Sequence, residues 1–185
     1  MKAAAVVANE DVQYQEVEEP QAKPGWVKIK VKASGICGSD VPRVLNHGVH
    51  FYPIVLGHEF SGDVVEVGEG VTKVKVGVSG APLLPCMKCD DCQQGNFSLC
   101  KHYSFIGSRQ QGSNADYVVI PEQNAIPFDP SISYEQGAMF EPSTVALHGL
   151  LQNDYQGGQC VAILGCGTIG IFTMQWAKIF GSKKV

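Results

Sequence analysis

Four cysteines fall within fifteen residues of this 185-residue chain, and their spacing restricts the fold of that segment more than any other feature does. They are Cys86, Cys89, Cys92 and Cys100, in the pattern C-x2-C-x2-C-x7-C. Four thiolates at such spacing are typical of a closed tetrahedral zinc site, which stabilises a loop too small to have its own core. Because all four ligands are thiolates, the zinc would have no open position and its role would be structural.

Two other interpretations of the cysteine cluster stay open, namely paired disulfides and an iron–sulfur cluster. The bacterial iron–sulfur pattern has three residues before its fourth cysteine and a proline after it. Here seven residues precede Cys100 and Lys101 follows it. This departure from the iron–sulfur pattern favours zinc.

Composition places the chain among ordinary globular proteins, with 44% hydrophobic and 17% charged residues. Fourteen Lys and Arg against eighteen Asp and Glu give a net charge of −4, so the basic field that nucleic acids require is missing. The sequence has neither an apolar run of membrane-spanning length nor the apolar region of a signal peptide near its N-terminus. We expect a cytoplasmic protein with neither nucleic acid nor membrane as a partner. In the reducing cytoplasm, clustered cysteines bind metal more often than they form disulfides.

The first 125 residues consist of short apolar runs separated by Gly, Pro, Asn and Asp, a pattern typical of an all-β barrel or sandwich, and the first domain is predicted to span residues 1–130. In residues 26–32 the apolar side chains alternate with Lys28, Lys30 and Lys32. This alternation predicts a strand with one buried face and one solvated lysine face. Further strands are predicted at residues 60–67 and 117–120.

After residue 131 the pattern becomes helical. Residues 133–151 are predicted as a helix capped by Ser133, residues 160–164 as an apolar strand, and residues 171–180 as a helix that ends at Gly181. We expect residues 131–185 to form a linking helix and the first β-α unit of an incomplete second domain. One strand and one helix cannot complete a parallel sheet, so we also expect the chain to be a fragment of a longer protein.

The segment between that strand and that helix reads Gly-Cys-Gly-Thr-Ile-Gly, which matches G-x-G-x-x-G in the context that makes this motif a dinucleotide-binding loop. The three glycines would allow a tight turn, the approach of a pyrophosphate and close helix packing. A strand-to-helix turn without a ligand is the alternative. The acidic ribose ligand expected about 20 residues further on would fall beyond Val185, which leaves NAD and NADP both open. The candidate cofactor-binding residues are Gly165, Gly167, Thr168, Ile169 and Gly170.

A second set of candidate metal ligands is spread along the chain. Cys37, His58, Glu59 and Glu141 supply a thiolate, an imidazole and carboxylates, the mixed set that catalytic zinc uses when one position is left for water or substrate. Glu141 follows an apolar run, where a buried acid is costly unless it is paired or bound to a cation. Taken singly, Cys37 could be a buried core thiol and His58 an ordinary hydrogen-bonded histidine.

Together these residues resemble a known family. The segments Gly57-His58-Glu59-Phe60-Ser61-Gly62 and Cys37-Gly38-Ser39-Asp40, the four cysteines, Glu141-Pro142 and the glycine loop are similar to the motifs of the zinc-dependent medium-chain dehydrogenases/reductases, the alcohol and polyol dehydrogenase superfamily. Within it, residues 45–62 and 82–109 resemble the galactitol-1-phosphate 5-dehydrogenases most, with the sorbitol dehydrogenases next. The resemblance implies a mostly β GroES-like barrel with a zinc lobe at residues 86–100, followed by the start of an α/β Rossmann domain.

The resemblance also implies a reaction, in which zinc lowers the pKa of a polyol hydroxyl and hydride passes to NAD or NADP. Cys37, His58 and Glu141 would ligate a catalytic zinc, which makes two zinc ions per chain, and Glu59 would approach this metal or bind its water. Ser39 would relay the alcohol proton and Asp40 would orient His58. The full-length protein would be a homo-oligomer, whereas this chain alone would not turn over substrate.

Two departures from the family pattern concern the proton route and one strand. Many relatives carry a histidine where this chain has Pro42, so the path of the proton to solvent is open. Residues 77–80 read Gly-Val-Ser-Gly where relatives have Gly-Asp-x-Val, which leaves the strand register there undecided.

The substrate is predicted to be a polyol or a polyol phosphate such as galactitol 1-phosphate. An arginine fork matches phosphate geometry, and Arg43 and Arg109 are the candidates, with ordinary surface arginines as the alternative. The remaining histidines are predicted to be structural or surface residues; they are His47, His50, His102 and His148.

Two other function classes compete with a dehydrogenase. A non-catalytic zinc-binding domain would carry metal only at the cysteine lobe. A zinc-ribbon nucleic-acid binder conflicts with the acidic charge balance.

Overall fold

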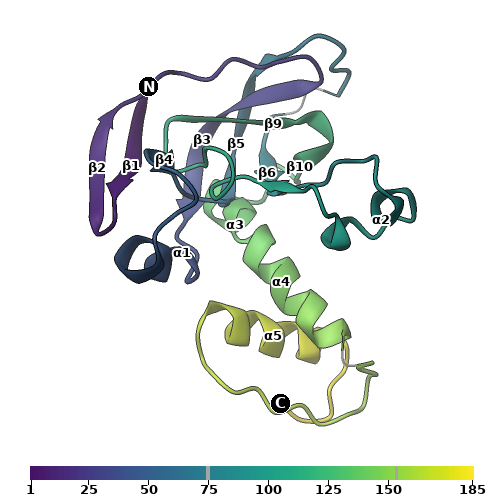
Figure 1. Ribbon diagram of the computed structural model, residues 1–185. Coiled ribbons are helices and arrows are strands. Elements are labelled where there is room, and N and C mark those ends of the chain that lie inside the picture. The colour runs from purple at the N-terminus through teal and green to yellow at the C-terminus, as the bar shows by residue number, and fades with distance from the viewer. Residues whose placement is uncertain (74–75, 153) are drawn as a thin grey trace. The chain divides into compact units, whose positions relative to one another are not determined.

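The computed structural model describes residues 1–73, 76–152 and 154–185. The chain divides into two compact units, Met1–Ala138 and Met139–Val185 (Figure 1). Across the described ranges, every helix falls short of the length and apolar character that a membrane crossing requires.

The first unit is built from antiparallel strands in three sheets, with the strand orders β2-β1-β4, β10-β6-β5-β3-β9 and β7-β8. The strands are β1 (Lys2–Ala8), β2 (Asp11–Glu16), β3 (Trp26–Gly35), β4 (Ile54–Val55), β5 (Glu59–Val67), β6 (Val78–Gly80), β7 (Leu83–Leu84), β8 (Ser104–Phe105), β9 (Tyr117–Pro121) and β10 (Ala125–Pro127). Short helical segments connect them: α1 (Asp40–Pro42), a π-helical turn (Arg43–His47), α2 (Asp90–Gln93), two 3-10 turns (Phe97–Leu99 and Glu122–Asn124) and α3 (Tyr134–Ala138). The mostly β character predicted from the sequence is confirmed.

The longest strands, β3 and β5, pair from Val27–Val67 to Gly35–Glu59, with two shifts of register, and lie side by side in the first unit (Figure 1). Their buried side chains form the main core together with those of β6 and β9, and Phe60, Ile29 and Ile120 are fully buried there. Gly35 pairs with Glu59 at one end of this ladder. The pairing brings the segment that follows β3 to the segment that precedes β5, and these two segments carry the candidate ligands.

The predicted strands at residues 26–32, 60–67 and 117–120 are confirmed as parts of β3, β5 and β9. The register left open at residues 77–80 is resolved by β6, in which Ser79 pairs with Ser61. Val74 and Lys75, which precede this strand, lie outside the described residues.

One prediction about β3 is wrong, because its lysines do not share a single solvated face. Lys30 and Lys32 are exposed, but Lys28 is buried. Its ammonium donates to Glu19 Oε1 at 2.9 Å and forms an ion pair with Glu66. Alternation along one strand could not reveal these partners, because they come from other segments.

Helix α3 fixes the end of the first unit to the central strands. Ser61 Oγ donates to the Tyr134 carbonyl at 2.5 Å, and Tyr134 OH donates to Asp63 Oδ1 at 2.6 Å. The Asp63 carboxylate raises the pKa of the Tyr134 phenol by holding its proton. These two hydrogen bonds therefore hold β5 against α3.

The helix predicted over residues 133–151 is interrupted at Met139, between α3 and α4 (Phe140–Leu151). Pro142 gives the reason, since its ring would clash with the carbonyl of Ala138 in a continuous helix and it has no N–H to donate. The predicted cap is confirmed. Ser133 Oγ accepts from the Gln136 N–H at 3.3 Å while Gln136 Oε1 accepts from the Ser133 N–H at 2.9 Å, a reciprocal capping box.

The second unit consists of α4 packed against α5 (Thr168–Ile179), where Trp176 Nε1 donates to the Ser143 carbonyl at 3.0 Å. Gly181, at φ +80°, follows α5 as predicted. The predicted strand at residues 160–164 is absent from the described structure, apart from a single parallel bridge between Cys160 and Lys184. A parallel strand needs neighbours on its edges and cover on its faces, and here Leu164 is fully exposed.

Candidate metal centres

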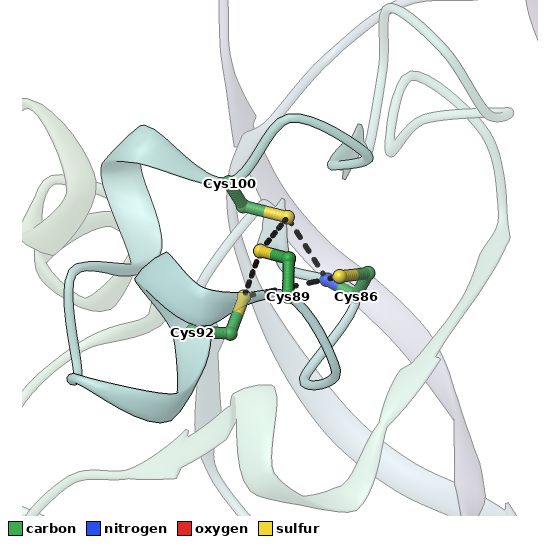
Figure 2. A group of neighbouring side chains, drawn as sticks. All are labelled: Cys86, Cys89, Cys92 and Cys100. Carbon is green, nitrogen blue, oxygen red and sulfur yellow. Dashed lines mark hydrogen bonds between the residues drawn. The ribbon is translucent and has the colours of Figure 1, made fainter.

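The four clustered cysteines bring their sulfurs together in a lobe around α2 (Figure 2). The Sγ–Sγ distances are 3.5 Å for Cys89–Cys92, 3.9 Å for Cys89–Cys100 and 4.0 Å for Cys86–Cys92. A tetrahedral zinc with bonds of about 2.3 Å has sulfurs about 3.8 Å apart. The spacing of the sulfurs therefore fits a four-thiolate zinc, and all seven cysteines of the chain are unpaired rather than joined in disulfides.

The pKa values of two of these thiols are shifted in opposite directions, and a bound cation would favour the thiolate form of both. Backbone N–H groups of Lys88 and Cys89 lower the pKa of Cys86 to about 6. Burial and the neighbouring sulfurs raise the pKa of Cys92 to about 12. Thiolates packed this closely repel one another, and a divalent cation between them would remove that repulsion and favour all four charged forms.

A second cluster joins Cys37, His58 and Glu59, whose ligand atoms all lie within 4.8 Å of one another. Cys37 follows β3, His58 precedes β5 and Glu59 begins β5, so the pairing of the two strands brings the three together. Gly35 leaves room for this cluster, since a Cβ at that position would overlap Glu59 Oε2. The donor set of sulfur, imidazole and carboxylate could hold zinc with a position left open.

His58 is almost fully buried, with 4% of its surface exposed. The Phe105 ring packs against its imidazole in a T-shaped arrangement, with 5.4 Å between the ring centroids. Asp40, 3% exposed, points Oδ2 at His58 Nδ1 over 3.6 Å. Asp40 Oδ1 accepts from Arg43 Nη1 at 3.0 Å, so one buried carboxylate links the imidazole to an arginine.

Ser39 lies beside the thiol of this cluster, with its Oγ 3.2 Å from Cys37 Sγ. Burial raises the pKa of the Cys37 thiol above its ordinary value, and the hydrogen bond with Ser39 opposes this effect. A divalent cation would overcome the cost of burying the thiolate. The hydroxyl of Ser39 is placed to contact a group bound at the cluster.

Glu141 lies in the first turn of α4, within the second unit. The structure therefore brings three of the four predicted ligands into one cluster, and the ligand role of Glu141 stays a prediction.

The glycine loop leads into α5 in the second unit. Gly165 has a φ of +107°, a conformation that favours glycine, and Gly167 is the N-cap of α5. A Cβ at Gly170 would overlap the Gly165 carbonyl. Thr168 and Ile169 form the first turn of the helix, so the motif has the loop-to-helix geometry that anion binding uses.

Comparison with known proteins assigns the chain to a family. The model of the alcohol dehydrogenase GroES-like domain matches residues 23–130. The chain belongs to this family. The GroES-like match, together with the relatives described next, confirms the resemblance to the medium-chain dehydrogenases/reductases and the mostly β GroES-like fold followed by the start of a Rossmann part.

Three relatives illustrate the similarity. The chain is 44% identical over 161 residues to galactitol 1-phosphate 5-dehydrogenase of Escherichia coli K12, covering 86% of this chain and 46% of the relative. The crystal structure of galactitol-1-phosphate dehydrogenase from Escherichia coli superposes with a TM-score of 0.94 at 40% identity, covering 99% of this chain and 54% of that one. A structure from Sinorhizobium meliloti 1021, described as a zinc-binding dehydrogenase bound to NADP, gives 0.93 at 34% identity, with 98% and 54% covered. The chain thus spans about half the length of these relatives.

The two arginines considered for phosphate have different surroundings in the GroES-like domain. Arg109 is exposed, packs its guanidinium 4.7 Å from the Tyr103 ring centroid and donates to Tyr103 OH at 3.4 Å. Arg43 is paired with Asp40 and lines a cavity of about 480 Å³ that also contains Ser39.

The same cavity is lined by His47, His50 and Ser108, which were not predicted as site residues. A sequence signal for two of them exists. Arg43, His47 and His50 follow the spacing i, i+4, i+7, which would place the three on one face of a continuous helix. Polar residues with this spacing usually form a solvated helix face, so the spacing alone does not distinguish a binding site from an ordinary exposed surface.

Proposed function

We propose that this GroES-like domain is the substrate- and metal-binding half of a zinc-dependent oxidoreductase that transfers hydride between a polyol and NAD or NADP. The observation that carries the proposal is the convergence of Cys37, His58 and Glu59 within 4.8 Å, beside the Ser39 hydroxyl. Membership of the alcohol dehydrogenase family supports it, as do relatives named as polyol dehydrogenases and a structure with bound NADP.

The donor sets fit two zinc ions with different tasks. Cys86, Cys89, Cys92 and Cys100 would hold a structural zinc, and Cys37, His58 and Glu141 would hold a catalytic one with Glu59 next to it. When bound, the catalytic zinc would supply Lewis acidity toward an alcohol oxygen and the nicotinamide would accept hydride.

The chain's own residues would orient the alcohol and carry its proton. Ser39 Oγ, next to Cys37 Sγ, would relay the proton of the substrate hydroxyl, accepting it while its own hydroxyl proton passes on toward solvent. Asp40 Oδ2, which lies 3.6 Å from His58 Nδ1, would accept a hydrogen bond from Nδ1 when His58 binds the metal and so orient the ring for its ligand role. In the second unit, the backbone from Gly165 to Gly170 binds the cofactor pyrophosphate at the N-terminus of α5.

We further propose that the substrate is a phosphorylated polyol. The support is the 44% identity to a galactitol 1-phosphate 5-dehydrogenase and the presence of Arg43 and Arg109 as cations for a phosphate. The cytoplasmic location and the homo-oligomeric state of the full-length protein remain predictions.

Metal content and activity together test the proposal. The 185-residue chain should bind two zinc ions and Cys37→Ser should bind one, while Cys160→Ser, which removes an exposed cysteine outside both clusters, should still bind two. In the full-length protein Cys37→Ser should abolish polyol oxidation. Zinc bound only by the cysteine lobe, with no oxidation of any polyol by the wild type, would instead identify a non-catalytic zinc-binding domain.

A further inference from the structure

The cavity beside Ser39 has the chemistry of an anion site. Among its described lining residues are one arginine, two histidines and two serines, and that lining contains no Asp or Glu. A volume of about 480 Å³ lies within the range of about 300–1,000 Å³ that is usual for small-molecule sites. Donors without competing carboxylates in the lining favour an anion over a cation as the ligand.

Three of the donors come from one short stretch of the chain, residues 43–50. Arg43 and His47 begin and end the π-helical turn Arg43–His47, and His50 follows Gly48. Irregular π-helical turns are common at functional sites. Ser108 reaches the same cavity from the segment after β8 and is buried.

Arg43 can serve Asp40 and an anion together. One of its N–H groups is occupied by Asp40 Oδ1, and a guanidinium has five N–H donors in a planar fork. Asp40 offsets the charge of this arginine, so Arg43 alone would attract a dianion weakly. His47 and His50 add two further donors, and each imidazole donates whether it is neutral or protonated.

The cavity adjoins the position at which the reacting alcohol would bind. Ser39 lines the cavity and also contacts Cys37 Sγ. A ligand with its hydroxyl at Ser39 could extend along the cavity toward the histidines. A phosphate monoester separated from the reacting hydroxyl by a short carbon chain has this shape.

We propose that Arg43, His47, His50 and Ser108 form the phosphate subsite for a polyol phosphate substrate. The proposal deepens the proposed function and rests on it for the identity of the substrate. It assigns the phosphate to this cavity rather than to Arg109, which stacks on Tyr103 outside the lining.

Direct binding is measured with inorganic phosphate on the zinc-loaded 185-residue chain. Phosphate is titrated against chloride at fixed pH and ionic strength, and the imidazole NMR signals are assigned with the variants His47→Gln and His50→Gln. The signals of His47 and His50 should shift and saturate, while those of exposed His102 and His148, which lie outside the lining, should stay in place. Parallel shifts of all four histidines, or none, would overturn the subsite.

Kinetics of the full-length protein identify which phosphate the subsite takes. His47→Gln and His50→Gln should each raise KM for galactitol 1-phosphate about tenfold more than KM for galactitol, as expected from losing a hydrogen bond to a charged group. Arg109→Gln should produce a much smaller difference. A selective rise in KM for the nicotinamide cofactor would overturn the proposal, because the anion would then be the cofactor's phosphate.

The two proposals can fail separately. Saturable shifts of His47 and His50, in a full-length protein that oxidises no alcohol, would support the anion site while refuting the dehydrogenase function. Normal dehydrogenase activity with equal KM changes for galactitol and its phosphate would refute only the subsite.

Discussion

Asp40 Oδ2 and His58 Nδ1 lie 3.6 Å apart, and neither atom has a hydrogen-bond partner in the described part of the chain. Both residues are buried, where an unpaired polar atom is costly. A movement of a few tenths of an ångström would convert this contact into a hydrogen bond. Metal binding by His58 would provide a reason for that movement, because a ligating histidine commonly donates its other N–H to a carboxylate.

Replacing Asp40 should therefore weaken the metal at the Cys37 cluster. We expect Asp40→Asn to reduce zinc affinity at this site about 10- to 100-fold, since the amide orients the ring less well and does not stabilise its ligand form. Competition with a chromophoric chelator measures the zinc affinity of the Cys37 cluster and of the cysteine lobe separately. Asp11→Asn, on the β1–β2 hairpin, is the matched control, and an equal loss in both variants would contradict the positioning role of Asp40.

The cysteine lobe should bind zinc with a marked dependence on pH. Cys92, with its pKa raised to about 12, must lose a proton when zinc binds, whereas Cys86, with its pKa lowered to about 6, is already largely ionised at pH 7. Affinity should therefore rise from pH 6 to pH 8, and proton release should come mainly from the thiols other than Cys86. Calorimetry in two buffers of different ionisation enthalpy counts the protons, and a count of zero would contradict thiolate ligation.

Removal of the lobe's zinc should also destabilise the first unit. We expect Cys92→Ser to lower Tm by about 10 °C or more, because the lobe has little core of its own and metal binding contributes to its folding free energy. Differential scanning calorimetry with and without chelator measures the effect. Cys166→Ser, an exposed cysteine outside both clusters, should leave Tm close to that of the wild type.

Sequence reasoning succeeded where the signal is local. The four cysteines span fifteen residues, and the Gly165 to Gly170 motif is continuous, so their clustering needs no knowledge of distant contacts. The capping box at Ser133 and the strands β3, β5 and β9 follow from short patterns as well. The proximity of Cys37 to His58 required the resemblance to a family, because only the pairing of β3 with β5 brings them together.

The failures occurred where distant segments decide the outcome. Lys28 is buried because Glu19 and Glu66 reach it from other parts of the chain. The segment 160–164 has strand-like composition, but among the described residues its single bridge joins Cys160 to Lys184. Arg43, His47 and His50 have a sequence spacing that exposed polar helices also show. Their place in the lining of one cavity is visible only in the folded structure.

Close packing of Gly80 against Phe60 predicts a position where even a methyl group is not tolerated. A Cβ at Gly80 would overlap the ring of Phe60, which is fully buried. We expect Gly80→Ala to destabilise the protein by about 1–3 kcal/mol in urea denaturation. Gly149→Ala, in α4 with no atom near the added Cβ, should stabilise by about 0.5–1 kcal/mol, so the two variants should differ in sign.

The ion pairs of Lys28 should stabilise the first unit only within a defined range of pH. Hydrogen bonds to Glu66 and Glu19 raise the pKa of Lys28, and the same contact with Lys28 lowers the pKa of Glu66. The raised lysine pKa gives stability that is complete below the unfolded value of about 10.4 and is lost as pH rises through the folded value. The lowered glutamate pKa gives stability that is present above about 4.3 and is lost as pH falls through the folded value.

Lys28→Met should consequently cost stability between about pH 5 and pH 10 and cost less outside that window. We expect a loss of about 1–2 kcal/mol at pH 7, since hydrogen bonds to a charged group are removed while the partly exposed glutamates can turn to solvent. Urea denaturation at pH 3.5 and pH 7 measures the difference. Lys30→Met, on the same strand with an exposed side chain, should cost little at either pH. A loss for Lys28→Met that is the same at both values would show that packing of the lysine stem, rather than its charge, stabilises β3, because methionine retains most of the stem but none of the ion pairs.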